Sequence, residues 1–93
     1  MEVTGLVSVP NPNPAFIQVQ VAGPADLIRV TFYSPAMVKV RVLEGPGNAG
    51  PGWTTLDARG LDLPNGAWFM SAVATRENLR SAPFKSVRIF IVR

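Results

Sequence analysis

Two residue types that dominate enzyme chemistry are missing from this 93-residue chain, which contains no cysteine and no histidine. Without cysteine no disulfide can form, and thiolate nucleophiles and thiolate metal ligands are excluded. Without histidine the chain lacks the side chain that most often acts as a general base near neutral pH and most often binds transition metals. These absences argue against an enzyme and against a bound metal or other cofactor.

Charged residues are also few, at 16% of the chain against 47% apolar residues. A chain this apolar can bury enough surface to offset its conformational entropy, which predicts a folded chain. We expect one domain, residues 1–93. The nine basic and six acidic residues give a net charge of +3, and the basic residues form no run. Nucleic-acid binding needs clustered cations, so nucleic acid is not an expected partner.

Long hydrophobic runs are absent as well. No stretch approaches the ~20 apolar residues of a membrane-spanning helix. The N-terminal sequence Met1-Glu2-Val3-Thr4 lacks the charged and apolar regions of a signal peptide. Three alternatives remain open: a leader that has been removed, a fragment of a longer protein, and a cytoplasmic protein.

The pattern that is present is alternation of apolar and polar residues, which predicts β-strands. Residues 15–22, 27–33 and 37–43 show it most clearly, and further strands are predicted at 3–9, 53–56, 67–75 and 84–92. Segment 67–75 is apolar on both faces near its start, which indicates either a central strand or one covered by the Gly/Pro loop. No segment has a convincing helical period. The side chains expected in the core from the three clearest strands are Ile17, Val19 and Val21; Ile28, Val30 and Phe32; and Val38, Val40 and Val42.

Glycine, proline and asparagine mark the connections. Segments 23–26 and 34–36 suit hairpins, the proline-rich segment 10–14 suits an extended crossover, and 44–52 and 76–83 read as loops. Asp57 and Gly60 bound one tight turn. Asn65 and Gly66 form a hairpin turn in which Gly66 needs a positive φ. Seven antiparallel strands with these turns predict an all-β, Ig-like or fibronectin-like β-sandwich, with a small barrel as the competing architecture.

The order of these motifs resembles a known family. It runs from Val9-Pro10-Asn11-Pro12 through a strand ending at Tyr33 to a turn that closes at Gly66 before the aromatic strand at Trp68. This order is similar to that of the Ig-like domain of the flagellar hook-capping protein FlgD, a module also found at the C-termini of secreted bacterial proteins. Asn13 stands where the family has Phe, and Leu56 where it has Trp.

The resemblance implies a non-enzymatic structural or assembly module with a sandwich fold. Its partner would be another protein: a second subunit, a neighbouring domain or a secretion apparatus. The expected location is extracellular or at the cell surface.

The candidate interface comprises the last strand and one tryptophan. Ile89, Phe90 and Val92 make that strand apolar on both faces, with little charge to protect its edge, which indicates contact with another chain unless the proline-rich segment covers it. Trp53, next to a Gly/Pro loop, is the other candidate. An alternative function is an extracellular carbohydrate-binding module using Trp53 and Trp68. Coplanar, exposed rings would favour sugar binding, and buried rings would favour assembly.

Charged residues suggest two further sites. Asp57 and Asp62 flank a turn, but a Ca²⁺ site takes roughly six to eight oxygen ligands, so capping of the turn is the expected role. A basic stripe on one solvent face, either for nucleic acid or as the polar half of alternating strands, would comprise Arg29, Lys39, Arg41 and Arg88.

Overall fold

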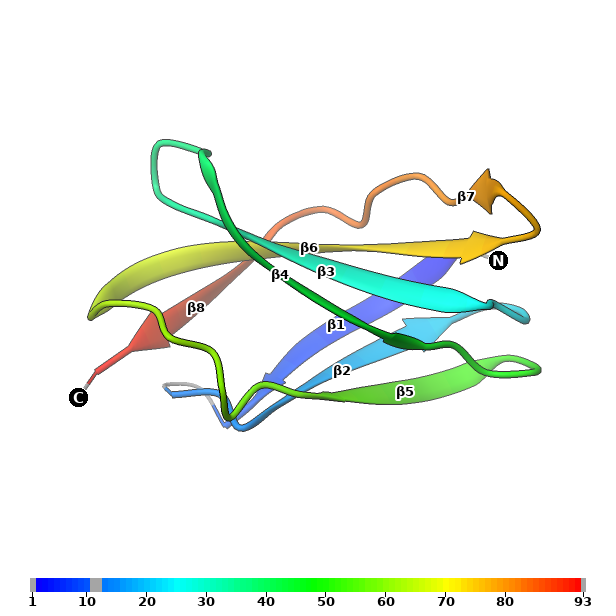
Figure 1. The fold of residues 1–93 in the computed structure, drawn as a ribbon, viewed down its shortest axis with the longest axis horizontal. Helices are drawn as coiled ribbons and strands as arrows, with labels where there is room; N and C mark the ends of the chain where they lie inside the picture. Colours follow the sequence, from blue (N-terminus) through cyan, green and yellow to red (C-terminus); the bar gives the residue numbers. More distant parts are fainter. Residues whose placement is uncertain (1, 11–12, 93) are drawn as a thin grey trace.

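The computed structural model describes residues 2–10 and 13–92, which form two antiparallel β-sheets and no helix. In the three-stranded sheet, β2 (Phe16–Val21) lies between β1 (Val3–Val9) and β5 (Gly52–Asp57). In the five-stranded sheet, β3 (Leu27–Tyr33) lies between β4 (Lys39–Pro46) and β6 (Gly66–Arg76). The short β7 (Leu79–Arg80) and then β8 (Val87–Ile91) pair with the other edge of β6 (Figure 1).

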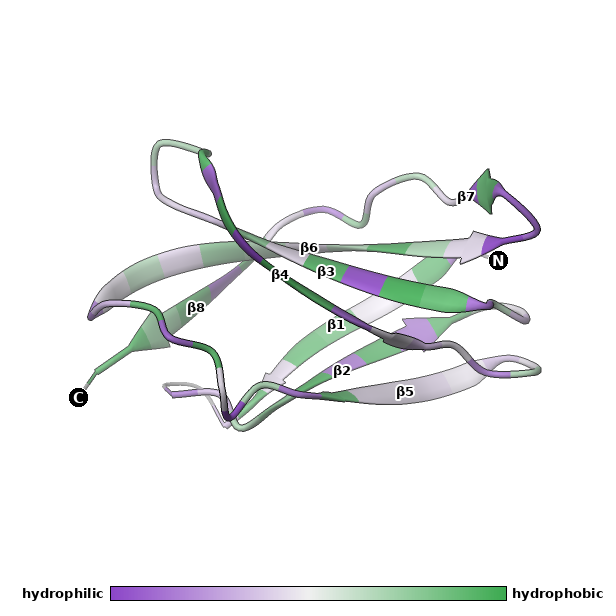
Figure 2. Cartoon of the chain, in the orientation of Figure 1, coloured by the Kyte–Doolittle hydropathy of each residue, from purple (hydrophilic) through white to green (hydrophobic). Residues whose placement is uncertain are grey.

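The two sheets face each other across a single core in a sandwich-like arrangement, with β3, β4 and β6 above β2 and β5 in Figure 1. The alternation read from the sequence decides which side chains enter that core, and it appears as green and paler bands along the strands in Figure 2. Burying each large apolar side chain stabilises the fold by roughly 1.5–3 kcal/mol. The predicted core residues of β2 and β3 are buried, together with residues of the later strands: Ile17, Val19, Val21, Ile28, Val30, Phe32, Met70, Ala72, Ala74, Ile89 and Ile91.

The strand assignments were confirmed at all seven predicted segments, with shifts of a few residues at their ends. The part of the chain that the structure describes adds an eighth strand, β7, inside the polar loop predicted at 76–83. The long loop predicted at 44–52 is shorter, because β4 continues to Pro46 and β5 begins at Gly52. Strand β6 is central in its sheet, as its two apolar faces predicted. No helix in the described residues has the length and hydropathy that crossing a membrane requires.

Several predicted connections were wrong, because a turn signal does not say which sheet the next strand joins. The hairpin at segment 34–36 is confirmed between β3 and β4. Segment 23–26 instead carries the chain from one sheet to the other, and so does the connection ending at Asn65 and Gly66. The opposite error occurs after β1, where the proline-rich segment was predicted to be an extended crossover. It joins β1 to β2, which are neighbours in one sheet. The Ala15 N–H donates to the Val9 carbonyl at 3.0 Å and closes this connection. Asn11 and Pro12 lie outside the described residues.

Strand β4 departs from the predicted alternation because its pairing with β3 contains an irregularity. Lys39 pairs with Tyr33 and Arg41 pairs with the buried Phe32, so that Val40 is an extra residue between the two pairs. Beyond this bulge, Val42 lies on the outer face and is 41% exposed. Val40 and Leu43 pack against the core instead. The expectation that Val38, Val40 and Val42 share a buried face was therefore wrong for Val42. It was also wrong for Val38, which precedes β4 in the hairpin connection and is 59% exposed.

Candidate functional site

The outer face of the three-stranded sheet carries almost no charge. The register places three rows of residues across it, each row running from β1 through β2 to β5. We call this surface the apolar outer face, and its residues are Gly5, Gln20 and Trp53; Val7, Gln18 and Thr55; and Val9, Phe16 and Asp57.

Four large apolar side chains of this face are each more than a third exposed. Trp53 is 48% exposed, Val7 42%, Val9 40% and Phe16 38%. These side chains come from all three strands and lie within three adjacent rows. They therefore form one patch and are not scattered over the surface. Single exposed apolar residues are ordinary on a protein surface, whereas a large contiguous apolar patch often marks an interaction site.

Trp53 lies across its neighbours and does not project from the sheet. A Cβ atom at Gly5 would come within 3.0 Å of Cη2 of Trp53 and within 3.1 Å of the Gln20 Cβ. The indole therefore extends from β5 over β2 to β1, and the missing side chain at Gly5 makes room for its far edge. The result is a flat aromatic surface flanked by uncharged residues.

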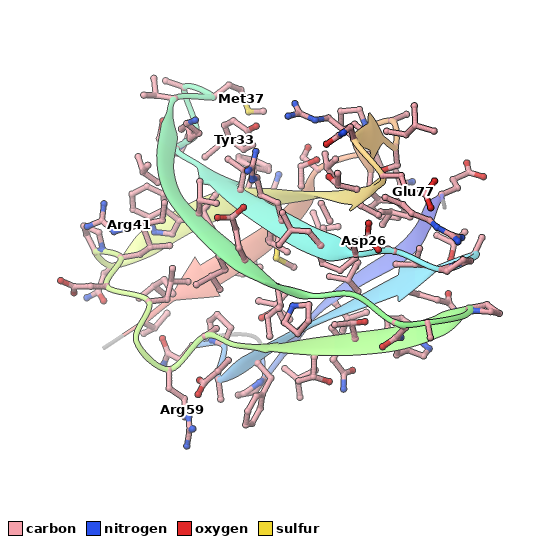
Figure 3. The ribbon with its side chains drawn as sticks, turned by 45° about the vertical axis from the view of Figure 1, so that its right-hand side comes forward. Asp26, Tyr33, Met37, Arg41, Arg59 and Glu77 are labelled. Atoms are coloured by element: carbon pink, nitrogen blue, oxygen red, sulfur yellow. The ribbon has the colours of Figure 1, made fainter. Side chains whose placement is uncertain are left out.

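The one charged residue in the three rows, Asp57, is neutralised by its neighbour. Arg59 donates from Nη2 to Oδ2 of Asp57 at 2.8 Å, and the backbone N–H of Arg59 donates to Oδ1 at 2.9 Å. The side-chain hydrogen bond, with the backbone bond adding to it, lowers the pKa of Asp57 to about 2 from an ordinary 3.8. The Arg59 guanidinium also lies 5.7 Å from the centre of the Phe16 ring, and it projects at the lower edge of Figure 3.

The last-strand residues predicted for the interface do not lie on the apolar outer face. Ile89 is fully buried in the core and offers no surface. Phe90 and Val92 are 42% and 62% exposed. Phe90 pairs with Ala67 on the outer side of the five-stranded sheet. The sequence grouped Trp53 with Phe90, but the two side chains lie on the outer faces of different sheets.

The outer edge of β8 is hydrogen-bonded by Asn13. The backbone N–H of Asn13 donates to the Phe90 carbonyl at 2.9 Å. Its side-chain amide accepts from the Val92 N–H at 2.8 Å and donates to the Val92 carbonyl at 2.6 Å. Asn13 thus makes three hydrogen bonds to the edge of β8, as a neighbouring strand would. Asn13 belongs to the proline-rich segment 10–14, which the sequence offered as the alternative cover for the last strand. As a single residue it stood out only as a departure from the family pattern.

The two tryptophans do not form one platform. Trp68 lies on β6, opposite the buried Ile89, and packs partly against the core. Its indole N–H donates to the Pro64 carbonyl at 2.9 Å. Trp53 is on the outer surface of the other sheet, so coplanar exposed rings of Trp53 and Trp68 are excluded by the fold.

The residues expected to shape turns have different surroundings. Asp57 caps the turn through the Arg59 N–H, and the Leu61 N–H donates to the Ala58 carbonyl at 3.0 Å. Gly60 lies in that turn without a positive φ. Gly66 has φ +142°, but it pairs with Ile91 at the start of β6 instead of forming a hairpin after Asn65.

The basic residues divide between two places. Arg29, Lys39 and Arg88 lie on the outer face of the five-stranded sheet, where Arg88 stacks 5.7 Å from the centre of the Phe69 ring. Arg41 does not join them, because it pairs with Phe32 and donates to the Val40 and Asp62 carbonyls. Figure 3 shows it beside the loop that precedes β6. Within residues 2–10 and 13–92, acidic side chains do not gather in any group of three that could hold a metal ion.

No protein-family model, no curated protein and no solved structure matches this chain.

Proposed function

We propose that this chain is an Ig-like β-sandwich module, without enzymatic activity, that assembles with another protein through the apolar outer face. The strand order supports the Ig-like assignment. The first, second and fifth strands share one sheet, and the third, sixth and last share the other. Strands A, B and E and strands C, F and G are distributed in the same way in Ig domains. On this assignment β7 is a two-residue addition to seven main strands.

The observation that carries the proposal is the composition of the apolar outer face. Four large apolar side chains are exposed there, and the only charged residue in the rows is already ion-paired. A partner docking on this face would bury apolar surface, at about 25 cal/mol per Å², without leaving an unpaired charge in the interface. The resemblance to the FlgD-like family supports the same class of function and an extracellular or cell-surface location.

A carbohydrate-binding module is the second candidate, because the exposed indole of Trp53 lies flat beside Gln20 and Gln18. An indole face can stack on a sugar ring, and amides can bond its hydroxyls. Titration with soluble polysaccharides separates the candidates. Sugar binding would quench the fluorescence of Trp53, and this quenching would disappear in Trp53→Ala, whereas an assembly module would show no response.

Lysine substitutions on the apolar outer face test the assembly function. Val7→Lys and Phe16→Lys place a charge in the patch at positions that are already exposed, so we expect melting temperatures close to that of the parent chain. The size of the native complex, measured by size-exclusion chromatography of extracts from cells that make the protein, should fall to that of the free chain.

Leu79→Lys is the matched control, because Leu79 is a 68% exposed apolar residue on β7, in the other sheet. It should leave the complex intact. Phe90→Lys tests the earlier expectation for the last strand in the same assay. Loss of the complex with Phe90→Lys and not with Val7→Lys would move the interface to β8 and overturn the proposal.

A further inference from the structure

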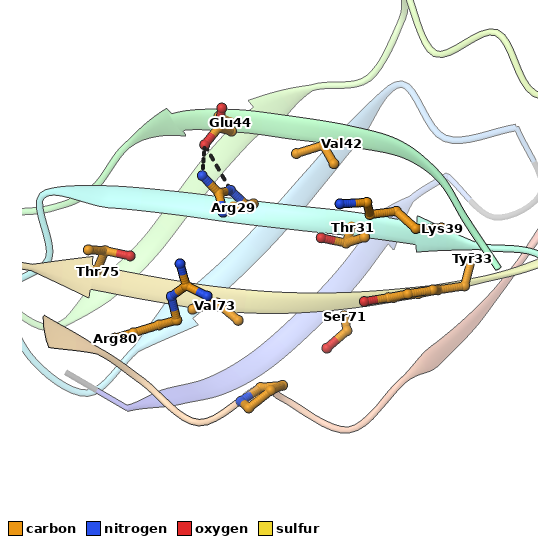
Figure 4. A pocket seen from close by; sticks show the side chains of 11 residues that line it. Arg29, Thr31, Tyr33, Lys39, Val42, Glu44, Ser71, Val73, Thr75 and Arg80 are labelled. Atoms are coloured by element: carbon orange, nitrogen blue, oxygen red, sulfur yellow. Dashed lines mark hydrogen bonds and ion pairs between the residues drawn. The ribbon is translucent and has the colours of Figure 1, made fainter. Parts of the chain in front are cut away.

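The outer face of the five-stranded sheet contains an open groove of about 600 Å³. Its floor is formed by β3 and β6, and its two walls are β4 and the segment that follows β7 (Figure 4). The residues that line it are mainly polar, in contrast to the apolar outer face. Its polar lining residues include Arg29, Thr31, Tyr33, Lys39, Glu44 and Arg80.

The wall after β7 is held in place by hydrogen bonds to β6, although it contains little regular strand. The Ser81 N–H donates to the Ala74 carbonyl at 2.8 Å, and the Ala74 N–H donates to the Ser81 hydroxyl at 2.9 Å. Further along, the Phe84 N–H donates to the Ala72 carbonyl at 3.0 Å, and the Ser71 hydroxyl donates to the Phe84 carbonyl at 2.6 Å. The groove therefore exists before any ligand arrives, which lowers the entropic cost of binding.

The groove carries an excess of positive charge that the described residues do not compensate. Arg29 is paired with Glu44, its Nη2 atom lying 2.8 Å from Oε2. Lys39 and Arg80 are exposed, and within the part of the chain that the structure describes neither has an ion pair or a hydrogen bond from its side chain. Two cations are thus available to a ligand.

The two free cations lie toward opposite ends of the groove. Lys39 is opposite Tyr33 at the end of β3, and Arg80 is opposite Thr75, which itself pairs with Leu27 at the beginning of β3. At about 3.3 Å per residue, the six steps from Leu27 to Tyr33 correspond to roughly 20 Å. A single small anion cannot contact both, whereas an extended chain with several carboxylates can. The hydroxyls of Thr31 and Tyr33 on the floor can donate to the same ligand.

We propose that this groove binds an extended acidic segment of a partner protein. Nucleic acid fits less well, because its affinity comes from neutralising several phosphates, and only two cations without an ion pair are among the described residues that line the groove. The groove is on the sheet opposite to the apolar outer face. It would give the module a second contact, and its failure would leave the first proposal untouched.

A hexaglutamate peptide is the probe, with hexaglutamine as the uncharged control, and binding is measured by NMR titration of the intact chain. We expect hexaglutamate to shift amides of β3, β6 and the segment after β7, and its affinity to fall as salt is added. Lys39→Gln and Arg80→Gln should each weaken it about threefold, as the loss of one exposed charge contact predicts. Arg59→Gln removes the same charge outside the groove and should leave the affinity unchanged.

A gain of affinity separates the proposal from general damage to the fold. Glu44→Gln removes the only carboxylate among the lining residues and frees Arg29, so hexaglutamate should bind about threefold more tightly. Absence of binding at millimolar peptide, equal binding of hexaglutamine, or an equal loss with Arg59→Gln would each overturn the proposal. Tighter binding of a six-nucleotide single-stranded DNA than of hexaglutamate would also overturn it, and would assign the groove to nucleic acid.

Discussion

The backbone of Gly66 has a conformation that other residues rarely adopt, with φ +142°. An added Cβ would meet no atom nearer than 4.0 Å, so the penalty for a larger residue is conformational and not steric. Gly66→Val should lower the free energy of unfolding by roughly 1–3 kcal/mol, as measured by urea denaturation.

Gly60 provides the comparison, because it has no positive φ and a Cβ added there would meet no atom within 4 Å. Gly60→Ala should be neutral or stabilise the chain by up to about 1 kcal/mol, since alanine restricts the unfolded state. Equal losses at both positions would contradict the conformational explanation.

Thr54 is the one buried side chain in the described residues with an oxygen that has no hydrogen-bond partner. It is 8% exposed, and it lies on the inner side of β5, opposite Val19. Burying an unpaired hydroxyl costs about 1–3 kcal/mol, and valine has nearly the same shape without that oxygen. Thr54→Val should therefore raise the melting temperature, whereas Thr55→Val on the outer side should change it little. A lower melting temperature for Thr54→Val would show that the hydroxyl has a partner.

At the scale of elements, the last strand depends on one residue from the other end of the chain. Asn13 makes three hydrogen bonds to the outer edge of β8 and has φ 62°. Asn13→Gly keeps this backbone conformation available and removes the amide, so it should cost about 1–3 kcal/mol for the two side-chain bonds. Asn13→Ala should cost more, because alanine also disfavours the positive φ.

Hydrogen exchange is the direct measurement, because the Val92 N–H donates to the Asn13 side chain. Its exchange should accelerate in both variants, while that of Ile89 in the core should accelerate less. Unchanged protection at Val92 would mean that the edge of β8 is held in another way.

The strands themselves could be predicted from the sequence, because period-two alternation depends only on neighbouring residues. Ile17, Val30 and Phe32 were all assigned to the core on that basis, and all are buried. The partner of each strand could not be predicted, since the proline and glycine signals before β3 and β6 are the same for a hairpin and for a change of sheet. The bulge at Val40 was missed for a related reason: it depends on how β4 pairs with β3 and not on the composition of β4.

At the scale of the whole molecule, the two outer faces differ in chemistry. The outer face of the three-stranded sheet is apolar, and Asp57, the only charged residue in its three rows, is ion-paired with Arg59. The outer face of the five-stranded sheet contains a cationic groove. The residues of the apolar outer face can be read from the sequence, but the sequence does not show that they lie close together. Val7, Phe16 and Trp53 are far apart along the chain, and only the pairing of β1 with β2 and of β2 with β5 brings them together. The outward Phe16, Gln18 and Gln20 were a usable signal, because an exposed strand face without charge is unusual.

Site-specific photo-crosslinking reports which surface of the chain another protein covers, so it tests assembly through the apolar outer face. A benzophenone amino acid is placed at Val7 in the apolar outer face, and separately at Leu79 on β7, in cells that make the protein. Both sites are exposed apolar positions, so the two variants should fold alike. We expect irradiation to give a discrete cross-linked species from Val7 and none from Leu79. The same species from both positions, or one from Leu79 alone, would contradict assembly through the apolar outer face.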